Sequence, residues 1–391
     1  MRAAPAFLPY GRQTIEDDDI AAVAAALRDD FLTTGPRVEA FETAFAAAVG
    51  ARHAVACANG TAALHLAMLA LDVRPAEVCI VPSITFLATA NCARYVGAEV
   101  VFADVDPESG LMTPETLADA VARAGGRRIA AVLPVHLRGD VAELPALRRI
   151  AGAAGAALVE DACHAVGARM TFDNIPARAG DNRWSEMAVF SFHPVKTLTT
   201  AEGGMVTTAD LRLAERLRRF RSHGMIRPGG AEPWWYEMAE IGFNYRLPDV
   251  LCALGLSQLA KLPRFAARRR ALAARYGTAL APLAPLVRPA ARPPGSDPAP
   301  HLMTVLIDFA AAGKTRVEVV EALRARGVGS QVHYIPVHRQ PYYVARYDAL
   351  DLPGAEAWYD RCLSLPLYPA MADDDVDRVA GALAEILNPP P

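Results

Sequence analysis

Residues 188–208 read AVFSFHPVKTLTTAEGGMVTT, two strand-like runs joined by a polar turn. The first run, at 188–192, leads to Lys196 in the turn, and a Gly-Gly pair precedes the second run at 205–207. Burying a lysine as a cation at the end of a core strand is costly, and the cost disappears if the amine is bound covalently as an imine. Pyridoxal 5′-phosphate (PLP) binds lysine in this way. A surface lysine beside a β-turn fits the spacing alone equally well.

Around this stretch, short apolar runs alternate with helical segments. The runs are rich in β-branched residues, and helix-like segments such as 62–71 and 114–124 lie between them. This rhythm predicts an α/β fold with a mainly parallel sheet covered by helices on both faces. The expected strands are 53–57, 78–81, 100–103, 129–134, 157–159, 188–192 and 205–207.

The second part of the chain has a different character. Residues 247–280 predict a long helix, interrupted near Pro263, and a proline-rich connection follows at 282–300. We expect a large domain over 1–246, with its N-terminal segment packed on a small domain, and the linking helix with that small domain over 247–391. The small unit is predicted to contain a strand at 301–307 and helices at 314–326 and 373–387.

Two carboxylates end another predicted strand. Residues 159–164 read VEDACH, and because neighbouring strand residues alternate in direction, one of Glu160 and Asp161 should point inward. A carboxylate placed against the pyridine nitrogen of PLP keeps that nitrogen protonated and makes the ring an electron sink. Asp161 and Lys196 follow successive strands at one sheet edge, so the two interpretations support each other. An aspartate that caps a helix is the alternative.

The segment ANGTAAL, residues 58–64, directly follows the first predicted strand. A turn of small residues that opens a helix presents free backbone N–H groups and the positive end of the helix dipole, which favours phosphate. The segment is not a G-x-G-x-x-G dinucleotide fingerprint. Nor is Gly313-Lys314-Thr315 a P-loop, because Asp308 stands where the first glycine is required.

Two aromatic features lie near these motifs. Phe86 follows a predicted strand and could stack on a planar cofactor ring, although a buried core phenylalanine is the more common role. Residues 234–236, WWY, follow a Gly-rich loop. They either line a sugar-nucleotide pocket or pack beneath one.

Composition narrows the possible partners and compartment. The 391 residues include 40 Lys+Arg and 43 Asp+Glu, a net charge of -3, which gives no electrostatic reason to expect a nucleic-acid partner. No apolar run reaches the roughly 20 residues of a membrane span. The first residues lack the apolar centre of a signal peptide. We therefore expect a cytoplasmic protein without membrane or nucleic-acid partners.

The number and spacing of cysteine, histidine and lysine residues bear on whether the chain binds a metal and whether it has an amine nucleophile. The six cysteines stand singly, which favours reduced core residues over a structural zinc site. His193, His223, His333 and His338 lack the spacing of metal ligands, so we expect no metal. Only three of the 40 basic residues are lysines. Arginine cannot be deprotonated in a protein, so a retained lysine can serve as an amine nucleophile where arginine cannot.

Taken together, these motifs resemble the DegT/DnrJ/StrS-type sugar-nucleotide aminotransferases. The resemblance covers nearly the whole chain. It implies fold type I, with a large PLP domain, a small C-terminal domain and a homodimer that shares its active sites. It also implies ping-pong transfer of an amino group from L-glutamate to a 4-keto sugar nucleotide. The most specific motifs are NGTAALHLAMLAL, PSITFLATAN, VEDACHAVGA, SFHPVKTLTTAEGGMVTT and GFNYRLPDVLCALGLSQL.

Carried over residue by residue, the resemblance implies that Lys196 is the catalytic, Schiff-base lysine. Asp161 matches the acid on the pyridine nitrogen, and His164 matches a polar neighbour of the ring hydroxyl. Relatives with histidine in place of the lysine act as sugar dehydratases, and Lys196 argues against that branch. The other implied cofactor contacts are Gly60, Thr61 and Ser191 on the phosphate, Phe86 stacked on the ring, and Asn244 reaching the phosphate from the other subunit.

Segments such as RSHGM and VHYIPVHRQPYY are similar to one branch of the family in particular. That branch aminates C4 of a UDP-linked 4-keto-6-deoxy-N-acetylhexosamine in a pseudaminic acid type pathway. Residues 136–140, HLRGD, depart from the more usual H-x-A-G-x pattern. The similarity implies substrate contacts at Tyr10, Asp30, Phe31, Leu32, Thr33, Tyr334, Ile335, Pro336 and Val337.

Three other readings stay open on the sequence. The first is a family member that uses a different keto sugar. The second is a non-catalytic PLP-fold sensor, whose mark would be loss of Lys196 or Asp161, and both are present. The third is a PLP enzyme that acts on a free amino acid, such as a lyase, which would need an arginine to hold the α-carboxylate.

Overall fold

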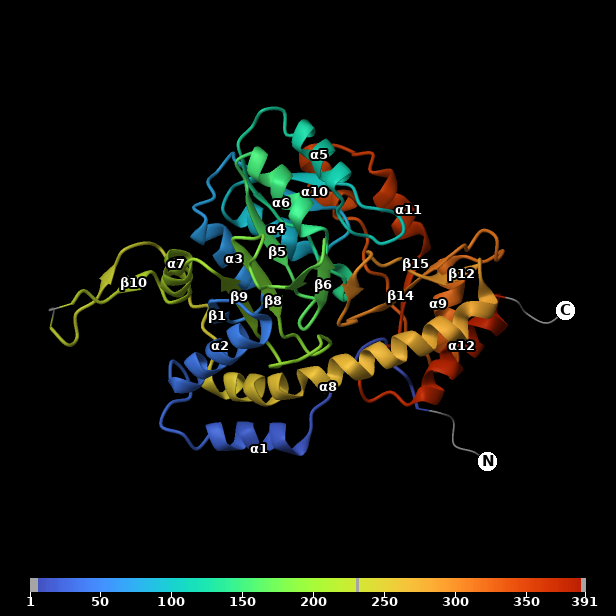
Figure 1. The fold of residues 1–391 in the computed structure, drawn as a ribbon, viewed down its shortest axis with the longest axis horizontal. Coiled ribbons are helices and arrows are strands. Elements are labelled where there is room, and N and C mark those ends of the chain that lie inside the picture. Colours follow the sequence, from blue (N-terminus) through green and yellow to red (C-terminus); the bar gives the residue numbers. More distant parts are fainter. Residues whose placement is uncertain (1–5, 230–231, 388–391) are drawn as a thin grey trace.

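The computed structural model describes residues 6–229 and 232–387, which form two units of unequal size. The larger unit surrounds a central sheet, and the smaller one lies at the right of Figure 1. Helix α8 (Asp249–Leu280) runs along both units and connects them (Figure 1).

The central sheet contains all seven predicted strands, in the order β1-β9-β8-β5-β4-β2-β3. Six strands share one direction, whereas β9 runs antiparallel to both of its neighbours, β1 and β8. Almost all residues in these strands are buried, as expected when helices cover both faces. The predicted α/β fold is confirmed. The strands are β1 (His53–Cys57), β2 (Val78–Pro82), β3 (Glu99–Ala103), β4 (Ile129–Val132), β5 (Ala157–Asp161), β8 (Met187–Ser191) and β9 (Gly204–Thr208).

Alternate residues of one strand serve two separate cores. In β1, Ala54 and Ala56 pack in the core under α2, α5, α6 and α8, whereas Val55 and Cys57 pack in the core under α3, α4 and α7. The period of two along the strand thus gives the sheet two buried faces. The helices are α2 (Pro36–Val49), α3 (Gly60–Ala70), α4 (Leu87–Tyr95), α5 (Pro114–Arg123), α6 (Leu144–Ala153) and α7 (Leu211–Arg221).

Helix α8 is unbroken, and α1 (Asp17–Ala26) packs along it. The predicted interruption near Pro263 is therefore wrong. Proline removes one backbone donor from a helix. However, the neighbouring Leu262 and Phe265 side chains are buried in the structure, and tertiary packing of this kind supplies most of the stability of a helix in a protein.

The small unit contains an antiparallel sheet in the order β12-β14-β15. Leu8, near the start of the chain, pairs with Val328 and is buried in the core of this unit. The N-terminal segment thus lies on the small unit. The elements are β12 (Val287–Pro289), β14 (Met303–Ile307), β15 (Cys362–Leu365), α9 (Arg316–Ala325) and α12 (Asp373–Leu387).

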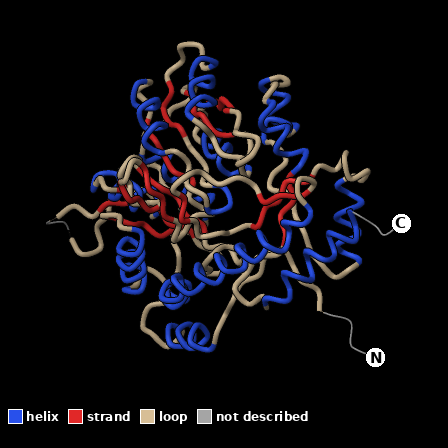
Figure 2. The backbone as a smooth tube through the Cα atoms, turned by 45° about the vertical axis from the view of Figure 1, so that its right-hand side comes forward, coloured by secondary structure: helices blue, strands red, loops and turns tan. Residues whose placement is uncertain are grey.

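Two late helices lie against the large unit instead. Tyr343 of α10 (Pro341–Tyr347) and Trp358 of α11 (Pro353–Arg361) are buried in the core that also contains α3 and α4. Figure 2 shows the strands of the central and small sheets as separate groups among the helices. Short elements complete the fold: β6 (Arg169–Phe172), β7 (Ile175–Arg178), β10 (Met225–Ile226), β11 (Glu237–Met238), β13 (Ser296–Asp297) and the 3-10 turns Leu137–Gly139, Ala281–Leu283 and Val337–Arg339.

Candidate active site

A cavity of about 680 Å³ lies where β5 and β8 end and α3 begins. Ligands of parallel α/β sheets usually bind at the carboxyl ends of the strands. Segments from the N-terminus and from residues 331–340 complete the wall, so both halves of the chain contribute. The sequence-predicted residues that line it are Tyr10, Gly60, Thr61, Phe86, Asp161, His164, Ser191, Lys196, Tyr334 and Ile335.

Lys196 enters this cavity from the turn after β8. Its backbone N–H donates to the carbonyl of His193 at 2.9 Å, which closes the turn. Burial lowers the pKa of its amine below the ordinary 10.5, although the charges of Cys163 and Asp161 oppose that shift. Among the described residues, Asp161 acts on the amine through its charge and not through a hydrogen bond. The lowered pKa favours the neutral amine, which is the form that reacts as a nucleophile.

The two carboxylates at the end of β5 point to opposite sides of the sheet. Asp161 lines the cavity, and its Oδ2 accepts a hydrogen bond from Thr89 Oγ1 at 2.6 Å. Glu160 is fully buried behind it, 2.9 Å from Nε2 of His136, and also accepts from Ser185. The expectation that one carboxylate points inward is met by Asp161.

The start of α3 forms a narrow cradle of backbone donors. Asn59 caps the helix, because its Oδ1 accepts from the N–H of Ala62 at 2.8 Å. The first N–H groups of a helix have no intrahelical acceptor, so those of Gly60 and Thr61 are presented to the cavity that both residues line. A Cβ on Gly60 would lie 2.9 Å from the Cβ of Ser191, so only glycine lets the backbone come this close.

Aromatic side chains form another part of the cavity wall. Phe86 is 56% exposed and lies at the N-cap of α4, so the interpretation of Phe86 as a buried core residue is wrong. Its ring centroid lies 6.2 Å from that of Tyr334. The ring of Tyr10 lies 5.5 Å from that of His333, and the carbonyl of Tyr10 accepts from the N–H of Leu367 at 3.0 Å.

Sequence reasoning missed one histidine of this wall. His301 lines the cavity, its ring lies 4.5 Å from that of His164, and its buried Nδ1 has no hydrogen-bond partner among the described residues. The only signal was its position at the end of the proline-rich connection, where we expected a strand to begin. His193 and His333 also line the cavity, whereas His338 lies outside and contacts Ser83. His223 does not line it either.

Two groups of predicted residues lie away from this cavity. Asn244 and residues 30–33 are exposed, and Leu32 accepts a hydrogen bond from the N–H of Asp249 at the start of α8. Residues 30–33 therefore lie beside the start of α8, whereas Asn244 pairs with Ser222 at the end of α7. Pro336 and Val337 are buried behind the cavity wall, where the N–H of Val337 donates to Ser83 at 2.9 Å.

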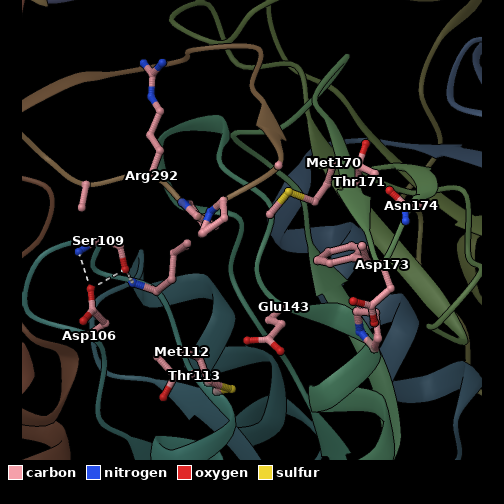
Figure 3. A pocket seen from close by; sticks show the side chains of 17 residues that line it. Asp106, Ser109, Met112, Thr113, Glu143, Met170, Thr171, Asp173, Asn174 and Arg292 are labelled. Carbon is pink, nitrogen blue, oxygen red and sulfur yellow. Dashed lines mark hydrogen bonds between the residues drawn. The ribbon is translucent and has the colours of Figure 1, made fainter.

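A second cavity, of about 720 Å³, lies near β6 and the connection at 291–295 (Figure 3). Asp106, Glu143 and Arg292 are among its lining residues, and Ser109 donates to Asp106 at 2.7 Å. The residues that line it include no lysine, histidine or cysteine. It has no group that could bind PLP covalently, so the first cavity is the candidate active site.

Several other sequence expectations concern the whole chain. All six cysteines are free thiols, and Cys163 lines the cavity instead of lying wholly in the core. In the described part of the chain, no three His, Cys, Asp or Glu side chains are arranged to hold a metal ion. None of the described helices combines the length and apolarity that a bilayer crossing requires.

The residues of the first cavity fit PLP in three ways. Lys196 supplies an amine, Asp161 supplies a carboxylate for the pyridine nitrogen, and the cradle at Gly60 and Ser191 supplies donors for the phosphate. Fold and site together define a PLP-dependent aminotransferase of fold type I.

The chain belongs to the DegT/DnrJ/EryC1/StrS aminotransferase family, whose model matches residues 13–384. The structure is similar to that of Helicobacter pylori PseC, an aminotransferase involved in the biosynthesis of pseudaminic acid, with 28% identity, a TM-score of 0.89 and 97% and 99% of the two chains covered. It is also similar to TlmJ, an aminotransferase from Streptoalloteichus hindustanus, with 31% identity, a TM-score of 0.88 and 97% and 98% covered.

A third similar structure is that of DesI, solved in the presence of its TDP-sugar product. The identity is 34%, the TM-score is 0.86, and 98% of this chain and 93% of that chain are covered. The protein is therefore a PLP-dependent sugar aminotransferase, as the sequence motifs implied.

Proposed function

We propose that this enzyme transfers the amino group of L-glutamate to C4 of a UDP-linked 4-keto-6-deoxy-N-acetylhexosamine, in a pathway of the pseudaminic acid type. The observation that carries the proposal is the meeting of Lys196, Asp161 and the α3 cradle in one cavity of a chain that matches PseC along almost its whole length.

Each residue of the cavity has a separate role in this reaction. PLP, when bound, supplies the electron sink that stabilises negative charge on the reacting carbon. Asp161 keeps a proton on the pyridine nitrogen, and the N–H groups of Gly60 and Thr61 hold the phosphate. The amine of Lys196 would move a proton to and from the reacting carbon as general base and acid.

A second candidate substrate is a TDP-linked keto sugar. DesI, whose structure was solved with a TDP-sugar product, is 34% identical to this chain, compared with 28% for PseC. Assays of amino transfer to matched UDP- and TDP-linked 4-keto-6-deoxy sugars distinguish the two. Preference for the TDP sugar would overturn the UDP proposal and leave the aminotransferase intact.

The proposal includes a homodimer with shared active sites. Residues 30–33 and Asn244 do not line the cavity of their own chain, and all of them are exposed. This position suits residues that serve a partner's cavity. Exposed apolar side chains belong to both of these stretches of the chain: Phe31 and Leu32 to the first, and Trp234, Trp235, Tyr236, Met238 and Ile241 to the segment before Asn244.

Ile241→Asp tests the dimer directly. Ile241 is 77% exposed, so a charge there would oppose association while leaving the folded subunit intact. In sedimentation experiments we expect the wild type to be dimeric and the variant to shift toward monomer, with loss of PLP affinity. Val317→Asp, on the exposed side of α9, is the matched control. A monomeric wild type with full PLP affinity would contradict shared sites.

The absorption spectrum tests the first half-reaction without any sugar. L-Glutamate should abolish the visible band of the PLP enzyme and produce the near-ultraviolet band of the aminated cofactor. A band that does not respond to glutamate would point to another donor or to a different PLP reaction, such as that of a lyase. A protein that shows no band after addition of PLP would support the sensor interpretation.

The proposed compartment is the cytoplasm. Six free thiols, five of them buried in the core, suit a reducing environment in which disulfides do not form. Fractionation of cells that produce the native chain, followed by immunodetection, tests this.

A further inference from the structure

Each carboxylate oxygen of Asp161 accepts a hydrogen bond from the protein. Its Oδ1 accepts from the backbone N–H of Cys163 at 3.1 Å, and its Oδ2 accepts from Oγ1 of Thr89 at 2.6 Å. Asp161 is 5% exposed and Thr89 is fully buried. The hydroxyl donor is therefore shielded from water, and a hydrogen bond is electrostatically stronger in such an interior than in water.

A second threonine supports the first. The Oγ1 atoms of Thr85 and Thr89 lie 2.7 Å apart, and Thr85 is 2% exposed. An ionised carboxylate only accepts hydrogen bonds, so the single hydroxyl proton of Thr89 points to Asp161. The hydroxyl of Thr85 must then donate to Thr89. The two hydroxyl groups thus form a donor chain in one direction, from Thr85 through Thr89 to Asp161, and each bond of such a chain strengthens the next.

The start of α4 brings both hydroxyl groups to the end of β5. Phe86 is the N-cap of this helix, Thr85 precedes it, and the N–H of Thr89 donates to the carbonyl of Phe86 at 3.2 Å. The first turn of a helix carries the positive end of the helix dipole, which adds to the stabilisation of a negative charge there. Both threonines line the same cavity as Asp161, so one helix start supports the carboxylate with two hydroxyl groups and a dipole.

We propose that Thr85 and Thr89 are positioning residues that keep Asp161 ionised and aimed at the pyridine nitrogen of PLP. The inference rests on the role of Asp161 proposed above. Hydrogen bonds to a carboxylate favour its charged form, so the proton that Asp161 shares with the pyridine nitrogen resides on the nitrogen. A protonated nitrogen makes the ring an electron sink, and both half-reactions need that sink. The two threonines therefore act on both half-reactions through Asp161, whichever sugar is the acceptor.

Nuclear magnetic resonance of enzyme loaded with PLP that carries ¹⁵N in its ring reports the protonation of the pyridine nitrogen directly. In the wild type we expect the signal of a protonated nitrogen. Thr89→Val keeps the shape of the buried side chain and removes the donor. The preference of the proton for the nitrogen should fall about tenfold or more, as for a lost hydrogen bond to a charged group, and the signal should move toward that of the unprotonated ring. Thr89→Ser, which keeps the hydroxyl, should restore the wild-type signal.

Thr85→Val tests the direction of the donor chain. It removes only the second hydroxyl, so the signal should move the same way as in Thr89→Val but less far. A movement in the opposite direction would show that Thr89 donates to Thr85 instead, and would overturn the proposal. Thr208→Val is the matched control, because it removes a fully buried hydroxyl outside the cavity, one that donates to the carbonyl of Glu186 at 2.7 Å. This variant should leave the signal unchanged.

Asp161→Asn separates this inference from the proposed function. It should give the signal of an unprotonated ring. If it does so while Thr89→Val keeps the wild-type signal, the proposal for the threonines is overturned and the role of Asp161 stands. A wild-type signal in Asp161→Asn would overturn both. Kinetics give a second readout, because Thr89→Val should slow the glutamate and the sugar half-reactions by similar factors and leave the Kd of glutamate unchanged. A loss confined to one half-reaction would contradict the proposal.

Discussion

The amine of Lys196 is buried, and its pKa is lowered for that reason. A neutral amine attacks the aldehyde of PLP, whereas an ammonium group does not. The rate at which apo-enzyme binds PLP covalently should therefore rise with pH through a midpoint below 10.5, the ordinary value for lysine. Stopped-flow absorbance across pH measures this rate. A midpoint at or above 10.5 would show that burial does not control the amine.

Lys196→Ala removes the amine and leaves the phosphate cradle intact. We expect no detectable turnover and no covalent cofactor, while non-covalent PLP binding survives in equilibrium dialysis because the donors at the start of α3 remain. Turnover near that of the wild type would contradict the assignment of Lys196. Lys314→Met, a lysine in the small unit, serves as the control.

Gly60→Ala tests the close approach in the cradle. The added Cβ would lie 2.9 Å from the Cβ of Ser191 and 3.3 Å from the Sγ of Cys163, so backbone or side chains must move. Overpacking of this kind costs roughly 1–3 kcal/mol. We expect a lower denaturation midpoint and weaker PLP binding. Gly152→Ala, where the Cβ meets nothing within 4 Å, should change neither.

At the scale of single residues, local patterns predicted the centre of the site better than its edges. Asp161 ends β5, Lys196 lies in the turn after β8 and Gly60 begins α3, so the fold rule alone brings them together. His301 and the backbone of Arg138 belong to loops whose course depends on long-range packing. No local pattern could indicate that the Arg138 N–H would meet His164.

Among the secondary-structure elements, α1 is attached to α8 by buried charges. Lys261, one of only three lysines, lies 2.6 Å from both Asp18 and the fully buried Asp19. Breaking a buried pair leaves an uncompensated charge and costs roughly 3 kcal/mol. Lys261→Met should lower the free energy of unfolding by about that amount in urea titrations. A change as small as that of Lys314→Met would show that the pair contributes nothing.

The contribution of this ion pair to the free energy of unfolding should decrease both at low pH and at high pH. Burial opposes the charge of Asp19, but hydrogen bonds from Lys261, Ser257 and Gln258 lower its pKa below 3.8. Its contribution is therefore complete above pH 3.8 and is lost as pH falls through the lower folded value. Burial also opposes the charge of Lys261, but Asp18 and Asp19 raise its pKa above 10.5, so its contribution is lost only as pH rises beyond that. The stability difference between wild type and Lys261→Met should be constant between these limits.

All seven central strands were predictable, because residues buried on both faces form continuous apolar runs. The two-residue strands β10 and β11 and the exposed hairpin β6–β7 contain no continuous apolar run, so the sequence pattern did not predict them. Helix α8 continues through Pro263 because residues distant in the sequence pack on it, which a local rule about proline does not include.

For the whole molecule, the small unit depends on the first residues of the chain. Leu8 is 5% exposed, pairs with Val328 and lies among residues of β14 and α12. Truncating a buried leucine costs about 2–5 kcal/mol. Leu8→Ala should lower the thermal midpoint and increase proteolysis of the small unit before the large one. Leu27→Ala, at a 59% exposed position, is the control. Equal protease resistance of Leu8→Ala and wild type would contradict this dependence.

The pairing of Leu8 with Val328 has a consequence for protein synthesis. The ribosome adds about 5–20 residues per second. The partner of Leu8 therefore leaves the ribosome roughly 15 to 60 s after Leu8 itself. During that interval the large unit can fold, while the first segment of the nascent chain stays without its docking place. A chaperone that binds short apolar peptides near the ribosomal exit should therefore crosslink to this segment early in translation and release it after residue 328 has emerged.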